Sequence, residues 1–228
     1  MVNISLKNKR LTIFAGHYGS GKTNLSVNYA LRLKEIYDNV SIADLDIVNP
    51  YFRTKDSMSV LDANGVKLIS SPFANSNVDT PALPADAYSL MEKNVTGIID
   101  VGGDDRGALA LGRFVDSIKN ENDYEMLFVI NKYRPLTNTP EKCVEIMKEI
   151  ESASKLPFTG IINNSNLGDE TTKEDILSSL PYADEVSRLT GLDIKFTSVK
   201  DTLSDSLKEE IKNIFPIRLY VKQSFSRK

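Results

Sequence analysis

Residues 16–23 read GHYGSGKT and match the pattern G-x-x-x-x-G-K-T in full. No other stretch restricts the fold as much, because this pattern forms a loop that must follow a strand and open a helix. Its glycines let consecutive backbone N–H groups point at an anion, Lys22 adds a positive charge, and the Thr23 hydroxyl is placed to ligate Mg²⁺. The positive end of the following helix favours the same anion. The pattern therefore predicts a phosphate-binding loop.

The residues on either side of the loop supply the required context. Leu11–Ala15 is a short apolar and β-branched run, as expected of a buried strand. After the loop, apolar side chains recur at helical spacing, which predicts a helix over Thr23–Tyr37. Strand, loop and helix thus follow in order, and an ordinary glycine-rich turn is the weaker interpretation.

The rest of the chain alternates apolar runs with helical patterns, which favours a parallel sheet covered on both faces. We predict an α/β fold, a three-layer α/β/α sandwich with a mostly parallel sheet and the P-loop NTPase fold, in a single domain over residues 1–228. Ligands of such sheets bind at the carboxyl ends of the strands. The predicted strands are Leu11–Ala15, Val40–Ala43, Val66–Ser70, Gly97–Val101, Met126–Ile130, Thr159–Ile162 and Ile194–Val199. The predicted helices are Thr23–Tyr37, Arg106–Lys119, Thr139–Ser154, Thr171–Thr190 and Leu203–Ile214.

Composition and charge argue against several functions. The net charge of −3 and the pI near 5.4 give no electrostatic reason to expect a nucleic-acid partner. No apolar run reaches the ~20 residues that span a bilayer, and Met1–Arg10 lacks the apolar core of a leader peptide. We therefore expect no membrane span and a cytoplasmic location. The single cysteine, Cys143, is expected to be packed in the core.

Two acidic segments follow predicted strands. Asp44 and Asp46 lie two residues apart, so on an extended backbone both side chains face the same way. One would hold Mg²⁺ through water while the other orients the attacking water, and turn-forming aspartates are the alternative. Asp100 ends an apolar strand, as a Walker B carboxylate does. Gly103, at D-x-x-G spacing, would bring its N–H to a γ-phosphate.

Asp104 and Asp105 follow directly. Two interpretations remain open for them: solvated surface charges, or the start of the next helix, where acidic residues are favoured by the helix dipole.

The loop, the D-x-D-x-x-x-P segment from Asp44 to Pro50 and the D-x-x-G segment from Asp100 to Gly103 resemble the CobQ/CobB/MinD/ParA nucleotide-binding family of the SIMIBI class of P-loop NTPases. The resemblance covers about residues 10 to 215 and includes Thr159–Asn164, similar to a strand that ends in a base-recognising asparagine. The phrases DLDIVNPYFR and DVGGDD are similar to those of bacterial ATP-binding proteins of unassigned role.

This resemblance implies a role for each matching residue. Lys22 and Asp46 would act in catalysis, and Asp46 would position the attacking water. Thr23 would ligate Mg²⁺, with Asp44 and Asp100 in the outer shell of the metal. Phosphate contacts would come from Gly16, Gly19, Ser20, Gly21, Lys22 and Gly103.

The resemblance also implies a base-recognising residue, Asn163, with Asn164 as the nearby alternative. Residues 131–134, NKYR, begin like the guanine-reading N-K-x-D motif. Arg134 stands where the aspartate would accept two hydrogen bonds from guanine, and arginine is a donor only. ATP with Mg²⁺ is therefore the expected cofactor.

Two positions bear on how such a site is completed. His17 stands where the MinD/ParA group carries a second lysine that reaches across a dimer, and an imidazole is a weaker phosphate clamp than an ammonium. Arg53 is either an arginine finger or a surface residue. The paired cysteines of iron-protein relatives are absent from the sequence, which disfavours a cluster. Ile217–Lys228 is expected to form a terminal strand or docked arm rather than a membrane helix.

The leading hypothesis is a Mg²⁺-dependent ATPase that couples its ATP or ADP state to an unknown protein or small-molecule partner, with a homodimer as one arrangement. The second is an ATP-dependent ligase or kinase similar to dethiobiotin synthetase, with the loop Ser71–Pro84 carrying the substrate. The third is a regulatory module that binds nucleotide without hydrolysing it.

Overall fold

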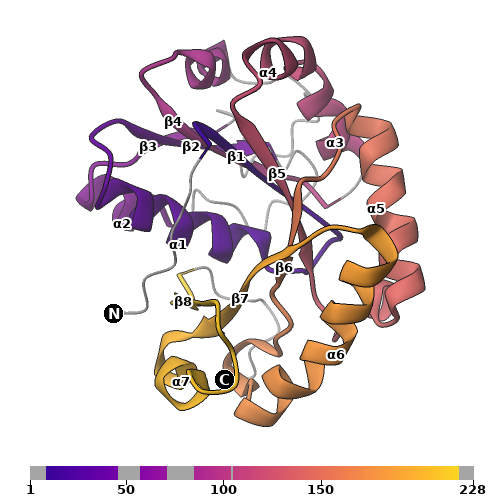
Figure 1. Cartoon of the computed structure of the whole chain (residues 1–228). Coiled ribbons are helices and arrows are strands. Elements are labelled where there is room, and N and C mark those ends of the chain that lie inside the picture. The colour runs from indigo at the N-terminus through magenta and orange to yellow at the C-terminus, as the bar shows by residue number, and fades with distance from the viewer. Residues whose placement is uncertain (1–8, 46–56, 71–84, 104, 221–228) are drawn as a thin grey trace, which may run out of the picture.

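The computed structural model describes residues 9–45, 57–70, 85–103 and 105–220. Eight strands form one sheet in the order β3-β2-β4-β1-β5-β6-β7-β8 (Figure 1). Every neighbouring pair in this order is parallel. The strands are β1 (Leu11–Ala15), β2 (Val40–Leu45), β3 (Lys67–Ser70), β4 (Thr96–Val101), β5 (Tyr124–Ile130), β6 (Gly160–Asn163), β7 (Ile194–Lys200) and β8 (Ile214–Ile217).

Helices cover both faces of the sheet (Figure 1). On one face, the sheet packs against Leu25 of α1 and Leu61 of α2. On the other face it packs against Leu111 of α3, Met147 of α5 and Val186 of α6. This confirms the three-layer α/β/α sandwich of the P-loop NTPase type. The helices are α1 (Lys22–Lys34), α2 (Met58–Ala63), α3 (Asp105–Gly112), α4 (Val115–Glu121), α5 (Pro140–Ser154), α6 (Lys173–Thr190) and α7 (Asp201–Ser204).

The central strand is β1, which lies between β4 on one side and β5 on the other. Four of its five residues are apolar and every one is buried, because helices lie on both faces of the sheet. The strand order reverses at β1, and in such sheets the crevice for a ligand opens at the carboxyl ends of the strands at that reversal. The loop of residues 16–23 leaves β1 at this point.

Most predicted elements match the observed ones within a few residues, but the helix predicted over Arg106–Lys119 is wrong in its middle. The chain forms two helices there, α3 and α4, separated by a break at residues 113–114. Gly112 ends α3, and Phe114 is the N-cap residue of α4. The Phe114 side chain is buried among the apolar residues of the α3–α6 face, which fixes the chain in this bend.

The helix predicted over Leu203–Ile214 is wrong over most of its length. Only α7 and a short 3₁₀ turn are helical there, and Ile214 begins β8. The apolar spacing that suggested a helix arises because Leu207, Ile211 and Ile214 pack together in a small separate cluster. β8 contains Pro216, which has no backbone N–H. An edge strand tolerates proline because one side of the strand forms no hydrogen bonds to a neighbouring strand of the described sheet.

The residues after β8 dock on α1. Asn28 donates from Nδ2 to the Arg218 carbonyl at 2.8 Å and accepts from the Arg218 N–H at 2.9 Å. One turn earlier, Asn24 Oδ1 accepts from the Tyr220 N–H at 2.9 Å. The expected docked arm is thus confirmed as far as residue 220.

Several expected features lie outside the described residues: Asp46, Arg53, Asp104 and the loop Ser71–Pro84. Asp105 is described only as the first backbone position of α3. Among the helices that are described, none combines the length and the apolar character needed to cross a membrane.

Candidate functional site: the phosphate loop and its supports

The loop of residues 16–23 depends on glycine at two kinds of position. Gly19 and Gly21 have positive φ angles of 77° and 88°, which side chains with a Cβ rarely adopt. Gly16 leaves no room for a Cβ, because that atom would lie 2.4 Å from the Val129 carbonyl oxygen of β5. The loop therefore lies tightly against β5, with a backbone that only this glycine pattern permits.

Three side chains hold carbonyl oxygens of the loop. Arg134 donates from Nε to the Gly19 oxygen at 2.6 Å. Asn164 donates from Nδ2 to the Ser20 oxygen at 2.6 Å. The ammonium of Lys22 donates to the His17 oxygen at 3.1 Å, as does the backbone N–H of Ser20 at the same distance. Carbonyls held in this way are kept from the space that an anion would need, so that loop N–H groups other than that of Ser20 can face it.

The start of α1 gathers the polar groups of the loop. Lys22 is 7% exposed and opens the helix, directly followed by Thr23. Ser20 is also buried, and its hydroxyl has no hydrogen-bond partner among the described residues. A buried hydroxyl without a partner costs free energy, and a phosphate oxygen is a partner of the kind that this position would accept.

Asp44 and Asp100 come together at the carboxyl ends of β2 and β4. They are in-register neighbours across this pair of strands, and Phe14 of β1 is the next residue in the row. Phe14 packs in the cluster on the α1 face. Because side chains of in-register residues point to the same face, both carboxylates lie on the face that carries α1 and Thr23. The described residues contain no group of three or more His, Cys, Asp or Glu that would hold a metal by itself.

Gly103 approaches the loop from β4. A Cβ at this position would lie 2.5 Å from the Tyr18 nitrogen and 3.0 Å from the His17 carbonyl carbon. The backbone of the D-x-x-G segment therefore touches the backbone of the loop. This places the predicted γ-phosphate contact beside the phosphate loop.

Asn163 and Asn164 lie at the end of β6, but both amides are engaged within the protein. Asn163 is fully buried; it donates to Ser179 Oγ at 2.9 Å and accepts from the Ser165 N–H at 3.2 Å. Asn164 bridges Ser20 of the loop and the hydroxyl of Ser198. Direct contact between Asn163 and a base would break these hydrogen bonds, so base recognition by Asn163 stays a prediction.

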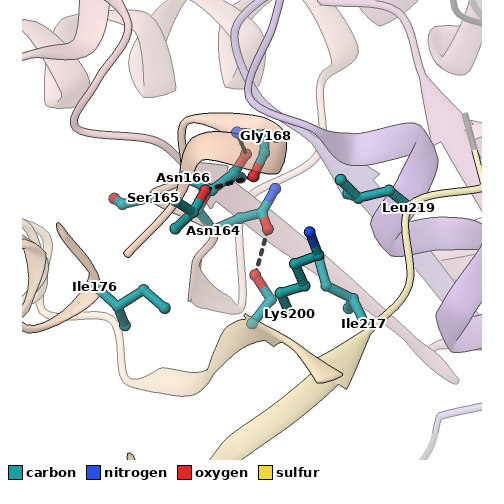
Figure 2. A pocket seen from close by; sticks show the side chains of 10 residues that line it. Asn164, Ser165, Asn166, Gly168, Ile176, Lys200, Ile217 and Leu219 are labelled. Atoms are coloured by element: carbon teal, nitrogen blue, oxygen red, sulfur yellow. Dashed lines mark hydrogen bonds between the residues drawn. The ribbon is translucent and has the colours of Figure 1, made fainter. Parts of the chain in front are cut away.

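A small open hollow lies beside Asn164 (Figure 2). Asn164 forms part of its wall and also supports the loop through Ser20, so the hollow adjoins the phosphate loop. Asn163 does not line it. The lining residues are Asn164, Ser165, Asn166, Gly168, Thr171, Ile176, Ser198, Lys200, Ile217 and Leu219.

The NKYR segment of residues 131–134 does not line this hollow. Asn131 is buried and accepts from the N–H groups of Tyr133 and Asn166. The Lys132 ammonium donates to the Ser178 carbonyl at 2.8 Å. These contacts tie the β5–α5 connection to the β6–α6 loop and to α6, which is a structural role.

The loop histidine has a shifted acidity. His17 donates from Nδ1 to the Tyr18 carbonyl at 2.9 Å, because a carbonyl can only accept. Partial burial lowers the pKa of the His17 imidazole, and the charge of Lys22 acts in the same direction. The ring is therefore mostly neutral near pH 7 when no anion is bound.

Sequence reasoning missed two of the three carbonyl supports. Asn164 was considered only as a base reader, and Arg134 only as a residue unsuited to guanine. Arg134 lies 115 positions from Gly19, so no local pattern links them. The contact follows from the pairing of β1 with β5, which brings the two loops side by side.

The fold and the site together define a P-loop NTPase fold. Solved structures with this fold include FtsY from Mycoplasma mycoides, with a TM-score of 0.56 and 21% identity over 87% of this chain and 63% of that one. FtsY from Thermotoga maritima has a TM-score of 0.54 and 22% identity over 85% and 63%. Signal recognition particle 54 kDa protein from Aeropyrum pernix has a TM-score of 0.50 and 17% identity over 82% and 40%.

The chain spans less than two thirds of the length of these structures, and at such identities the likeness concerns the fold. It does not single out the CobQ/CobB/MinD/ParA family. No protein-family model matches the chain, and no curated protein matches it either.

Proposed function

We propose that the protein binds a nucleoside triphosphate with Mg²⁺ and hydrolyses it, and that ATP is the nucleotide. The observation that carries the proposal is the phosphate loop itself: the carbonyl oxygens of Gly19 and Ser20 are held by side chains outside the loop, and a buried Ser20 hydroxyl has no described partner. A loop of this geometry, followed by a helix N-terminus, is an anion site for a polyphosphate.

The residues present fit a metal ion brought in with the nucleotide. Thr23 would ligate Mg²⁺, and Asp44 and Asp100 would hold its water ligands, since hard cations prefer oxygen donors. Bound there, Mg²⁺ would neutralise charge on the phosphates. Lys22 would hold the phosphates, and Asp46 is our proposal for the residue that positions the attacking water.

We propose that the base lies beside Asn164, where the described residues leave a hollow that holds about one water molecule and has to widen to admit a base. None of the ten residues that line this hollow is a carboxylate, and guanine is usually recognised by a carboxylate that accepts two hydrogen bonds. This favours adenine. The alternative is a guanine nucleotide, which the structure of the Aeropyrum pernix protein in complex with GDP supports. Asn166 lines the hollow and is partly exposed, so it is a better candidate for base contact than the fully buried Asn163, although its amide also donates to the Asn164 carbonyl and accepts from the Gly168 N–H.

The proposed output is the coupling of ATP or ADP state to a partner protein, through a homodimer or a second protein in the cytoplasm. Kinetic measurements would distinguish two alternatives. ADP release that depends on a metabolite would indicate ligation or phosphorylation of a small molecule. Tight binding without turnover would indicate a module that binds nucleotide without hydrolysing it.

The experiment that tests the proposal is thermal denaturation with Mg²⁺ and ATP, ADP, GTP, GDP or no nucleotide. A ligand at ~100 times its Kd adds about 2.7 kcal/mol, or about 5–10 °C for a domain of this size. Wild type should show this shift, with adenine nucleotides the more effective. Lys22→Ala should lose it, whereas Lys34→Ala, at the other end of α1, should retain it. Equal shifts in wild type and Lys22→Ala would refute the proposed site.

A further inference from the structure

Arg134 crosses from the β5–α5 connection to the phosphate loop. Besides the hydrogen bond from Nε to the Gly19 oxygen, its side chain lies against the Gly19 backbone: a Cβ on Gly19 would be 3.4 Å from Nε and 3.5 Å from Cδ. Gly19 has a positive φ angle of 77°, so its carbonyl could turn at little steric cost if nothing held it. Arg134 is the side chain that holds it.

The guanidinium is only partly used by this contact. It carries five N–H donors, and only the Nε donor is engaged, since its Nη groups make no hydrogen bond to any described residue. Arg134 also forms no ion pair within the described part of the chain, although it is half-buried. Burial lowers the pKa of the Arg134 guanidinium, which reflects the cost of a cation partly removed from water. An anion bound beside it would offset that cost.

Lys22 alone does not balance a polyphosphate. ADP and ATP carry about three and four negative charges, the described residues of the loop contribute one permanent cation, Lys22, and the Mg²⁺ of the proposed function adds two positive charges, which still leaves ATP with an excess negative charge. His17 is the only other basic side chain in the loop, and burial keeps its pKa low. Arg134 brings a second permanent positive charge to the loop from a different part of the chain.

We infer that Arg134 is a positioning residue for the nucleotide phosphates: it holds the Gly19 carbonyl outward and supplies a second positive charge that favours polyphosphates over monophosphates. The inference rests on the proposed nucleotide function. Arg134 thus has two separable roles, a hydrogen bond to the loop and a positive charge. Only the charge makes the loss of affinity on mutation depend on the number of phosphates in the ligand. A purely structural support would affect all ligands of the loop alike.

The test is calorimetric titration of the full chain with AMP, ADP and a non-hydrolysable ATP analogue in the presence of Mg²⁺. Arg134→Met removes the charge and the donor, Arg134→Gln keeps an N–H donor without charge, and Arg134→Lys keeps the charge. The matched control is Lys132→Gln, which removes one positive charge two residues away, where the ammonium is bound to Ser178.

We expect Arg134→Met and Arg134→Gln to weaken ADP and ATP-analogue binding about 10- to 100-fold, the range of a charged hydrogen bond, and to weaken AMP binding clearly less. Arg134→Lys should retain the preference for polyphosphates, and Lys132→Gln should resemble wild type.

An equal loss for AMP, ADP and the ATP analogue in both uncharged variants would overturn the inference, as would wild-type affinities in them. If Arg134→Met does not fold, the comparison of Arg134→Gln with Arg134→Lys decides, since they differ chiefly in charge. Failure of wild type to bind any nucleotide would overturn the proposed function and this inference with it. Wild-type binding with unaffected variants would overturn this inference alone.

Discussion

Asp44 and Asp100 are in-register neighbours on the parallel strands β2 and β4, so their side chains leave the sheet on the same face and at the same height. The helix that carries Lys22 and Thr23 packs on that face. Two carboxylates that are 56 positions apart in the sequence thereby face the start of one helix. This arrangement makes a prediction about magnesium.

Asp100→Asn should remove most of the effect of Mg²⁺. The amide is uncharged and cannot orient the water ligands of the metal as a carboxylate does, so Mg²⁺-dependent hydrolysis should fall at least about tenfold. Binding of ADP without Mg²⁺ should stay close to wild type or improve, because a negative charge near the phosphates is lost. Hydrolysis rates and ADP titrations with and without Mg²⁺ check this. Asp116→Asn, on the exposed side of α4, is the control.

Gly103→Ala should damage the phosphate loop. The new Cβ would meet the Tyr18 nitrogen at 2.5 Å and its Cα at 2.6 Å, and both are backbone atoms that cannot rotate away. We expect a cost of about 1–3 kcal/mol in stability and a loss of nucleotide binding of at least about tenfold. Gly112→Ala is the matched control, since the nearest atom to its Cβ lies at 3.8 Å. Chemical denaturation and ADP titration report both effects, and normal ADP affinity in Gly103→Ala would contradict the prediction.

His17 should report phosphate binding by its own titration. It is the only histidine in the chain, so its imidazole resonance needs no assignment by mutation. Burial lowers its pKa in the free protein, and a bound phosphate should raise it because the anion favours the charged ring. NMR titration between pH 5 and 8 should give a higher pKa with saturating ADP than without it. Adenosine, which lacks phosphate, should leave the pKa unchanged, and an unchanged value with ADP would show that the phosphates lie elsewhere.

Glu125 should make the protein less stable as the pH rises. Burial raises its pKa above the ordinary 4.5, even though Thr12 and Tyr29 donate hydrogen bonds to its Oε1 at 3.1 and 3.2 Å. Since the folded protein holds this proton more tightly than the unfolded chain, the contribution is complete below about pH 4.5 and is lost as the pH rises through the raised pKa.

Glu125→Gln keeps the acceptor oxygen and removes the ionisation. Its Tm relative to wild type should therefore increase from acidic to neutral pH, as measured by thermal denaturation between pH 4.5 and 8. A constant Tm difference across this range would rule out the explanation. Glu145→Gln, exposed on α5, controls for the loss of one negative charge.

Much of the fold was predictable because it depends on local patterns. The strand before the loop and the helix after it follow from Leu11–Ala15 and from the spacing of apolar residues in α1. Parallel pairing follows from strands that alternate with helices. Cys143 was expected in the core and is fully buried, and burial raises the pKa of its thiol to about 11.

The site was predictable only in part, because contacts between distant segments leave no local pattern. The aspartates at strand ends were found since the carboxyl ends of parallel strands meet at one edge. The support of the loop by Arg134 and Asn164 was not found, because it depends on which loops the strand order brings together. The same limit explains the C-terminal error, where Leu207 and Ile211 have helical spacing but pack against Ile176 of α6 without forming a long helix of their own.

The docking of residues 218–220 on α1 has a consequence for biosynthesis. Asn28 and Asn24 meet their backbone partners 190 and 196 positions later in the chain. The helix that begins in the phosphate loop therefore leaves the ribosome long before residues 218 and 220, and these hydrogen bonds form only after those residues have been synthesised. A nascent chain that has already made every strand up to β7 still presents this helix without its final partners, so the loop reaches its finished surroundings only when the whole described chain has emerged.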